Sequence, residues 1–384
     1  MTDTTKQSPT ASHRQVIRDV VNTMAPFASP PVEQDLREQG FDGPILRLHL
    51  NECPYPPSPK VVEAIREAAA GVNRYPDSWW RGPANILAER LDVPRHRIVF
   101  GNGSDQLLNA LGDLTLEDGH SAIVPEPSFH RYNLATEMQG AELIKVPLNP
   151  QGANDVEAML AAIRPNTPLI FTASPNNPTG GMLTGQELHR LADGVPDSCL
   201  LVLDEAYHEF AQREDGPDGL AAIRHREGPW VVLRTLSKAY GLAGLRIGYA
   251  ICGSDEIAEG LNKLRQAFQV NAIALAAAEA ALGDMEYGRW LVEQVAAERD
   301  RVMAEMRGMG LSPLPSVGNF ITADVGRPAA PLVGAIARRG IMIGTIRTPT
   351  PGYDTYIRLT VGTREEMDAL LLALAEELAA QAEQ

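Results

Sequence analysis

One lysine stands in a sequence context that could do covalent chemistry. Lys238 follows the apolar run Trp230 to Leu233, which predicts a buried strand, and hydroxyl-bearing and small residues flank it. An amine held at a strand end and shielded from water has a lowered pKa and is a better nucleophile. Such a lysine can form a Schiff base with an aldehyde. A solvated loop lysine is the alternative, since lysine is rarely buried, but the neighbours of Lys238 favour the first interpretation.

A glycine-rich turn could bind an anion. The residues from Gly101 to Gln106, G-N-G-S-D-Q, connect a predicted strand over 97–100 to a predicted helix over 107–114. Glycines let the backbone approach a ligand, and the unpaired amides at a helix start attract negative charge. Ser104 could also be a plain helix N-cap. For the turn taken alone the plain cap is favoured, and only a Schiff-base role of Lys238 makes a phosphate site the better interpretation.

The stretch T-L-S-K-A-Y-G-L-A-G-L-R-I-G-Y, from Thr235 to Tyr249, resembles a known active-site segment. It is similar to the Schiff-base segment of the fold-type I pyridoxal-phosphate enzymes, in the class I and II aminotransferases, and closest to their histidinol-phosphate aminotransferase branch. The resemblance extends from about Pro26 to the last helix. It implies pyridoxal 5′-phosphate on Lys238, and an α/β fold with a large doubly wound, mostly parallel sheet domain and a smaller α/β domain. Alternating predicted strands and helices agree with that fold.

The resemblance also implies roles for residues at other predicted strand ends. Asp204, after the apolar run 200–203, would hold the proton on the cofactor ring nitrogen, as a buried carboxylate can. Phe129 would stack on the ring, although it could be ordinary core, and Asn177 and Tyr207 would bond the ring 3′ oxygen. The other implied cofactor contacts are Gly103, Ser104, Asp105, Thr235, Ser237 and Arg246, with Tyr75 reaching the cofactor phosphate from the neighbouring subunit of a homodimer.

Substrate contacts are implied at three positions. Arg358, in the run Y-I-R-L-T-V-G, matches a family arginine that grips a carboxylate in a bidentate pair, although a strand arginine pointing to solvent is the alternative. Asn51 lies in a segment that passes over the active site in this family. Gly344 stands where the histidinol-phosphate branch usually has a phosphate-binding arginine, and Arg347, three residues on, is the next arginine.

The loss of that arginine bears on the amino donor. We expect histidinol phosphate to be a poor donor beside an unphosphorylated amino acid with an aromatic or otherwise bulky side chain, unless Arg347 compensates. Trp79, Trp80 and Cys53 could then line the substrate pocket. The expected reaction is amino transfer to a 2-oxo acid, with 2-oxoglutarate as the expected acceptor. A pyridoxal-phosphate decarboxylase or lyase is the first alternative, and a non-catalytic cofactor-binding protein is the second.

Length and composition set wider limits. The 384 residues suffice for one large and one smaller domain, and we expect an arm with part of the small domain over 1–60, the large cofactor domain over 61–270 and the small domain over 271–384. The net charge of −15 argues against nucleic acid or an anionic membrane as partner. Three cysteines without CxxC spacing indicate reduced thiols and a cytoplasmic protein. The polar residues 1–12 predict a disordered tail, no run has transmembrane length, and no metal site is expected.

Overall fold

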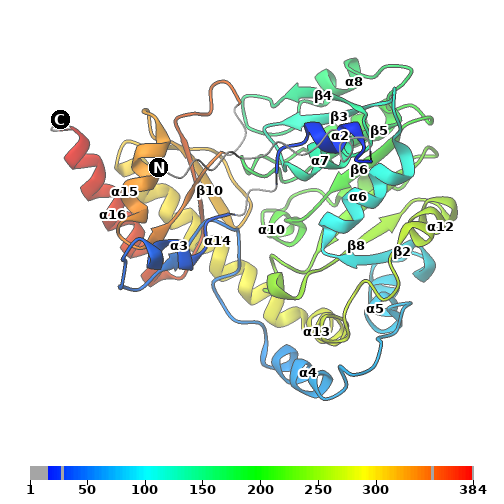
Figure 1. Cartoon of the computed structure of the whole chain (residues 1–384), viewed down its shortest axis with the longest axis horizontal. Helices are drawn as coiled ribbons and strands as arrows, with labels where there is room; N and C mark the ends of the chain where they lie inside the picture. The colour runs from blue at the N-terminus through cyan, green and yellow to red at the C-terminus, as the bar shows by residue number, and fades with distance from the viewer. Residues whose placement is uncertain (1–15, 27–29, 347–349, 383–384) are drawn as a thin grey trace, which may run out of the picture.

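The computed structural model describes residues 16–26, 30–346 and 350–382, and it is an α/β protein (Figure 1). A seven-stranded sheet has the order β2-β8-β7-β6-β5-β3-β4. Its neighbours are parallel except at β8, which runs antiparallel to both β2 and β7. This is the predicted large, mostly parallel sheet. Its strands are β2 (Ile98–Asn102), β3 (Ser121–Glu126), β4 (Glu142–Pro147), β5 (Leu169–Ala173), β6 (Leu200–Asp204), β7 (Trp230–Thr235) and β8 (Ile247–Cys252).

The central strands form the core of this sheet. Every residue of β5, β6 and β7 is buried, so both faces of the sheet are covered, as continuous apolar runs predict. Longer helices around the sheet are α6 (Ser104–Thr115), α9 (Gly185–Gly194) and α12 (Asp255–Leu264). Shorter ones are α7 (Arg131–Glu137), α8 (Val156–Ala161), α10 (His208–Arg213) and α11 (Gly219–Ile223).

A smaller antiparallel sheet with the order β12-β13-β10-β9 forms a second layer, on the left of Figure 1. Its strands are β9 (Ser312–Pro313), β10 (Phe320–Asp324), β12 (Gly344–Thr345) and β13 (Tyr356–Thr360). The helices α14 (Met285–Gly308), α15 (Ala329–Ala337) and α16 (Arg364–Ala382) pack on this side. Beside them, α13 (Ala272–Leu282) packs against α4 (Pro59–Ala69) and α5 (Arg81–Leu91). The domain boundaries after residues 60 and 270 stay a prediction.

The N-terminal part differs most from the expected elements. The alternating run 45–50 predicts a strand, but only β1 (Leu46–Arg47) forms, because pairing with β11 (Ile341–Met342) covers two residues of the run. The spacing of Val16, Val20 and Val21 predicts a helix over 15–24, but the described residues of this range form only α2 (Asp19–Thr23), and α3 (Glu33–Glu38) follows it. Ser104 is not an N-cap, because α6 begins at Ser104 and Gly103 takes the capping position.

Three further observations concern the described residues as a whole. No helix in the described ranges is long and apolar enough to cross a membrane. Nor do histidine, cysteine and acidic side chains in those ranges form a cluster of three that could hold a metal ion. All three cysteines are free thiols.

Candidate active site

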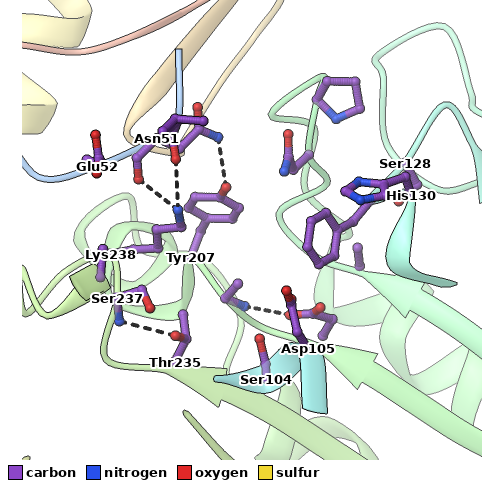
Figure 2. Close-up of a pocket in the computed structure, with 18 of the residues that line it drawn as sticks. Asn51, Glu52, Ser104, Asp105, Ser128, His130, Tyr207, Thr235, Ser237 and Lys238 are labelled. Carbon is purple, nitrogen blue, oxygen red and sulfur yellow. Dashed lines mark hydrogen bonds between the residues drawn. The ribbon is translucent and has the colours of Figure 1, made fainter. Parts of the chain in front are cut away.

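A cavity of about 600 Å³ lies where the carboxyl ends of β6 and β7 face the smaller sheet (Figure 2). It collects residues that are far apart in the sequence, as expected for the carboxyl edge of a doubly wound sheet. Twelve of the predicted site residues line it: Asn51, Ser104, Asp105, Phe129, Asn177, Asp204, Tyr207, Thr235, Ser237, Lys238, Arg246 and Arg358.

Lys238 lies three residues beyond the end of β7. Its Nζ donates to the main-chain carbonyls of Leu50, at 3.3 Å, and of Asn51, at 2.8 Å (Figure 2). Burial, together with the positive charge of Arg358, lowers the pKa of Lys238 to about 8. The predicted shielded amine is therefore present, with a larger neutral fraction at neutral pH than an exposed lysine has.

Asp204 ends β6 and is only 4% exposed. Its Oδ2 accepts from the Tyr132 hydroxyl at 2.8 Å, and its Oδ1 accepts from the backbone N–H of Ala206 at 3.0 Å. Burial raises the pKa of Asp204 to about 6. No ion pair among the described residues includes this carboxylate. The Asp204 carboxylate is therefore suited to pair with a cationic group of a molecule bound in the cavity.

The turn before α6 forms a cradle beside Arg246. Gly103 has a φ of +73°, and a Cβ added there would lie 2.6 Å from Arg246 Nη2, so the site needs glycine. The first amides of α6 and the Arg246 guanidinium are suited to an anion. Arg246 Nη2 is 3.9 Å from Asp105 Oδ2. Across the cavity, the backbone N–H of Ser237 donates to Thr235 Oγ1 at 3.1 Å (Figure 2).

Arg358 and Asn177 are joined from different layers of the protein. Arg358 Nη1 donates to Asn177 Oδ1 at 2.9 Å, and Nη2 donates to the carbonyl of His49 at 2.7 Å. Arg358 is thus fixed toward the cavity rather than pointing to solvent, and the Asn177 amide nitrogen is left as a donor for a bound group. Tyr207 accepts from Asn51 Nδ2 at 3.0 Å, and burial raises the pKa of Tyr207 to about 12, which keeps it a hydroxyl.

Some predicted residues are not brought to this cavity. Tyr75 is 81% exposed and stacks on Phe268 with 4.3 Å between ring centroids, away from the cavity of its own chain. Trp79 and Trp80 do not line the cavity either, because both pack against Arg265. Cys53 lines a separate smaller cavity, and Arg347 lies outside the described residues.

The sequence interpretation missed three polar residues that support the site. Tyr132 bonds Asp204, and its signal was its place one helical turn after Phe129. Glu205 forms a buried pair with Arg234, immediately beside Asp204 and Thr235. Asn319 Nδ2 donates to the Asn51 carbonyl at 3.0 Å across 268 residues of sequence, and no local pattern marks it.

The chain resembles known proteins over nearly its whole length. The sequence profile of the family described as aminotransferase class I and II matches residues 44–374. The "Histidinol-phosphate aminotransferase 2" of Methylococcus capsulatus is 40% identical over 335 residues, which is 86% of this chain and 89% of that protein. The protein of the same name from Pseudomonas aeruginosa is 41% identical over 94% of this chain and 96% of its own length.

Solved structures agree. The crystal structure of the histidinol-phosphate aminotransferase from Sinorhizobium meliloti, in complex with pyridoxal-5′-phosphate, superposes with a TM-score of 0.88 and 32% identity, and the match covers 95% of this chain and 98% of that one. A double mutant of the aspartate aminotransferase from Thermus thermophilus superposes with a TM-score of 0.79 and 25% identity, over 94% of this chain and 99% of the other. The sequence, the fold and the arrangement of the cavity agree, and the chain belongs to the class I and II aminotransferases.

Proposed function

We propose that this aminotransferase moves an amino group from an amine donor to 2-oxoglutarate, with Lys238 as the reacting amine. The supporting observation is that a shielded amine, Lys238, and a buried carboxylate without a cation, Asp204, lie in one cavity. The cofactor is pyridoxal 5′-phosphate, which supplies an aldehyde for a lysine amine and a protonated ring that draws electrons from the substrate.

The residues present fit this cofactor. The cradle at Gly103, which a Cβ would fill, is suited to the phosphate, and Asp204 is suited to the protonated ring nitrogen. Phe129 can stack on the ring, while Asn177 and Tyr207 can donate to its 3′ oxygen. We assign to the cofactor Gly103, Ser104, Asp105, Phe129, Asn177, Asp204, Tyr207, Thr235, Ser237, Lys238 and Arg246.

Lys238 and Arg358 would then have the main roles toward the substrate. The neutral amine of Lys238 takes the proton from the substrate Cα and later returns a proton as the ammonium. A pKa of about 8 leaves both forms populated near neutral pH. Arg358 binds the substrate carboxylate, because its guanidinium is already held by Asn177 and His49 and loses little freedom on binding. Asn51 and Arg347 are the remaining proposed substrate contacts.

The donor we propose is an unphosphorylated amino acid with a bulky side chain. The support is Gly344, which pairs with Arg358 in the smaller sheet and offers no cation there. Besides His130, the basic residues among the described lining are Lys238, Arg246 and Arg358, and all three have other proposed roles. Ile346 and Pro30 add apolar lining. A remote phosphate would lack a matched clamp, and its binding energy could not serve the reacting centre.

Histidinol phosphate is the second candidate donor. The relatives from Methylococcus capsulatus and Pseudomonas aeruginosa, at 40 and 41% identity, carry that substrate in their names. This candidate requires Arg347 to provide the cation that Gly344 does not.

The experiment is a donor panel with 2-oxoglutarate as acceptor, comparing kcat/KM for histidinol phosphate with phenylalanine, tyrosine, histidine, leucine and arginine. We expect one unphosphorylated amino acid to exceed histidinol phosphate. If histidinol phosphate wins by more than about a hundredfold, or roughly 2.7 kcal/mol, the donor proposal is wrong. Arg347→Ala then tests whether that arginine compensates.

The same assay without acceptor separates transamination from its rivals. Amino transfer leaves the bound cofactor in its aminated form, whereas a decarboxylase releases CO₂ and a lyase releases a fragment of the donor. A non-catalytic binding protein would leave the cofactor spectrum unchanged with every donor.

We further infer a homodimer with shared active sites. Tyr75 is exposed beside the exposed Phe268, and Trp79 adds a third exposed aromatic side chain in contact with Arg265 of the same region. Such a surface is suited to a second copy, and two-fold dimers are the commonest assembly. Inactive Lys238→Ala chains mixed with Tyr75→Ala chains should regain activity. Failure to regain it, with chain exchange verified, would contradict shared active sites.

The three free thiols support a cytoplasmic location.

A further inference from the structure

We propose that the main-chain carbonyls of Leu50 and Asn51 form a resting site for the Lys238 amine whenever it is not bonded to the cofactor, and that Asn319 is the positioning residue for this site. The inference rests on the proposed role of Lys238. It assigns a function to an N-terminal segment that lies outside the large sheet.

The carbonyl of Asn51 is shared between two donors. It accepts from Lys238 Nζ at 2.8 Å and from Asn319 Nδ2 at 3.0 Å, so both of its lone pairs are engaged. Asn319 is 1% exposed, and the same amide nitrogen lies 3.4 Å from the carbonyl of Glu52. A buried amide that holds two consecutive carbonyls fixes the direction in which this peptide segment faces.

The backbone of Asn51 has a left-handed conformation, which helps to direct its carbonyl toward Lys238. Its φ is +53°, in the left-handed region that asparagine tolerates better than most residues. Its backbone N–H donates to Thr360 Oγ1 at 2.8 Å, and its side-chain amide donates to Tyr207. These contacts anchor Asn51 to β13 and to the end of β6 at once, so its carbonyl is held toward the amine (Figure 2).

The resting site matters because Lys238 must change its protonation state. When the neutral amine takes a proton from the substrate Cα, it becomes an ammonium that can donate to both carbonyls. Burial and the positive charges of Arg358 and Arg246 lower the pKa of Lys238, whereas the negative charges of Glu52 and Asp105 raise it. Asp204 and Tyr207 line the same cavity. Two fixed acceptors favour the ammonium and partly offset the effect of burial.

The test measures the amine itself rather than turnover. Cofactor-free, full-length protein is trace-labelled with acetic anhydride between pH 6 and 10, and the Lys238 peptide is quantified by mass spectrometry. Asn319→Leu keeps the branching of the side chain but removes the donor, so the apparent pKa of Lys238 should fall by about half to one unit. Asn262→Leu, in α12 and away from this cavity, is the matched control and should leave that pKa unchanged.

A second pair of variants does not depend on Asn319. Asn51→Gly keeps the left-handed backbone and the carbonyl but loses the bond to Tyr207, so we expect a smaller fall in the apparent pKa of Lys238 than in Asn51→Ala. Asn51→Ala strains that backbone by about 1 kcal/mol or more and should lower the apparent pKa as Asn319→Leu does. If both folded variants, Asn319→Leu and Asn51→Ala, titrate like the parent, the resting site is refuted.

Failure of the proposed function would look different. Borohydride would then not attach the cofactor to Lys238 in the parent protein, whatever the titration shows.

Discussion

Two neighbouring carboxylates at the end of β6 have opposite environments. Asp204 and Glu205 are both 4% exposed. Glu205 Oε2 accepts from Arg234 Nε at 2.9 Å and Nη2 at 2.7 Å, and its Oε1 accepts from the backbone N–H of Gly219 at 3.0 Å. Although burial acts to raise it, Arg234 brings the pKa of Glu205 down to about 2. Burial instead raises the pKa of Asp204 to about 6.

The difference separates a structural charge from a functional one. The carboxylate of Glu205 is paired with Arg234 of the neighbouring strand and so links β6 to β7. The carboxylate of Asp204 accepts hydrogen bonds from the Tyr132 hydroxyl and the Ala206 backbone N–H but has no cation beside it. A shift from the ordinary 3.8 to about 6 costs the cofactor-free fold about 3 kcal/mol at neutral pH. A positively charged ring nitrogen beside Asp204 would remove that cost. The free-energy cost of burying the ionised Asp204 is thus relieved only when the cofactor binds, and such perturbed groups are typical of functional sites.

The largest expected effect is at Lys238, which lines the same cavity as Asp204. Lys238→Ala should lower kcat/KM for transamination by at least about four decades while leaving the fold intact, because the lysine is a chemical group rather than a packing one. Steady-state kinetics and circular dichroism check this, with the exposed Lys263→Ala as control. If Lys238→Ala transaminates near the parent rate, Lys238 is not the reacting amine.

Asp204→Asn should bind the cofactor but slow proton abstraction from the substrate Cα by about three decades, roughly 4 kcal/mol of barrier. The reason is that a neutral amide cannot hold the ring proton as a carboxylate does. Single-turnover absorbance with a good donor measures the step. A rate within tenfold of the parent would make Asp204 structural, like Glu205.

Glu205→Gln should show the reverse pattern. Removing one partner of a buried pair leaves Arg234 uncompensated, so the free energy of unfolding should fall by about 3 kcal/mol. The rate per folded molecule should stay within tenfold. Urea denaturation of this variant, beside Glu142→Gln from the exposed pair with Arg164, makes the measurement. If Glu205→Gln keeps the parent stability but transaminates a thousandfold more slowly, Glu205 is functional like Asp204, and the proposed difference between the two carboxylates is wrong.

The two carboxylates should also respond to acid in opposite directions. The pKa of Glu205 is lowered on folding, so its stabilisation is present above about 4.5 and is lost as the pH falls toward 2. The pKa of Asp204 is raised, so its cost is present above about 6 and disappears as the pH falls toward 3.8. Between pH 7 and 4, the stability of cofactor-free parent relative to Asp204→Asn should therefore rise by about 2 kcal/mol, as measured by urea denaturation at each pH. No change in that difference between pH 7 and 4 would mean that burial of the ionised Asp204 does not destabilise the fold.

The sequence was informative where a motif is local. Asp204 ends an apolar strand and Lys238 lies three residues beyond the next one, and the carboxyl ends of parallel strands must meet at one edge. The large sheet followed for the same reason, because its strands are continuous apolar runs. The alanine-rich run 272–282, between Asn271 and Gly283, has clear ends and predicts a helix over the residues that α13 covers.

Partners chosen by tertiary packing could not be predicted. The bond from Tyr132 to Asp204 and the bond from Asn319 to Asn51 join segments that no local pattern relates. The pairing of β1 depends on β11, almost 300 residues away, so its length was overestimated. Adjacent tryptophans suggested a substrate pocket, but a cation, Arg265, lies over both rings instead.

The most direct test of the contrast is the stability of cofactor-free Asp204→Asn and Glu205→Gln at pH 7.5, each measured against the parent. We predict opposite signs, with Asp204→Asn more stable by about 2 to 3 kcal/mol and Glu205→Gln less stable by about 3 kcal/mol. Added pyridoxal 5′-phosphate should then stabilise the parent more than Asp204→Asn. If both variants are destabilised without cofactor, Asp204 is already satisfied within the chain, and the account of this site is wrong.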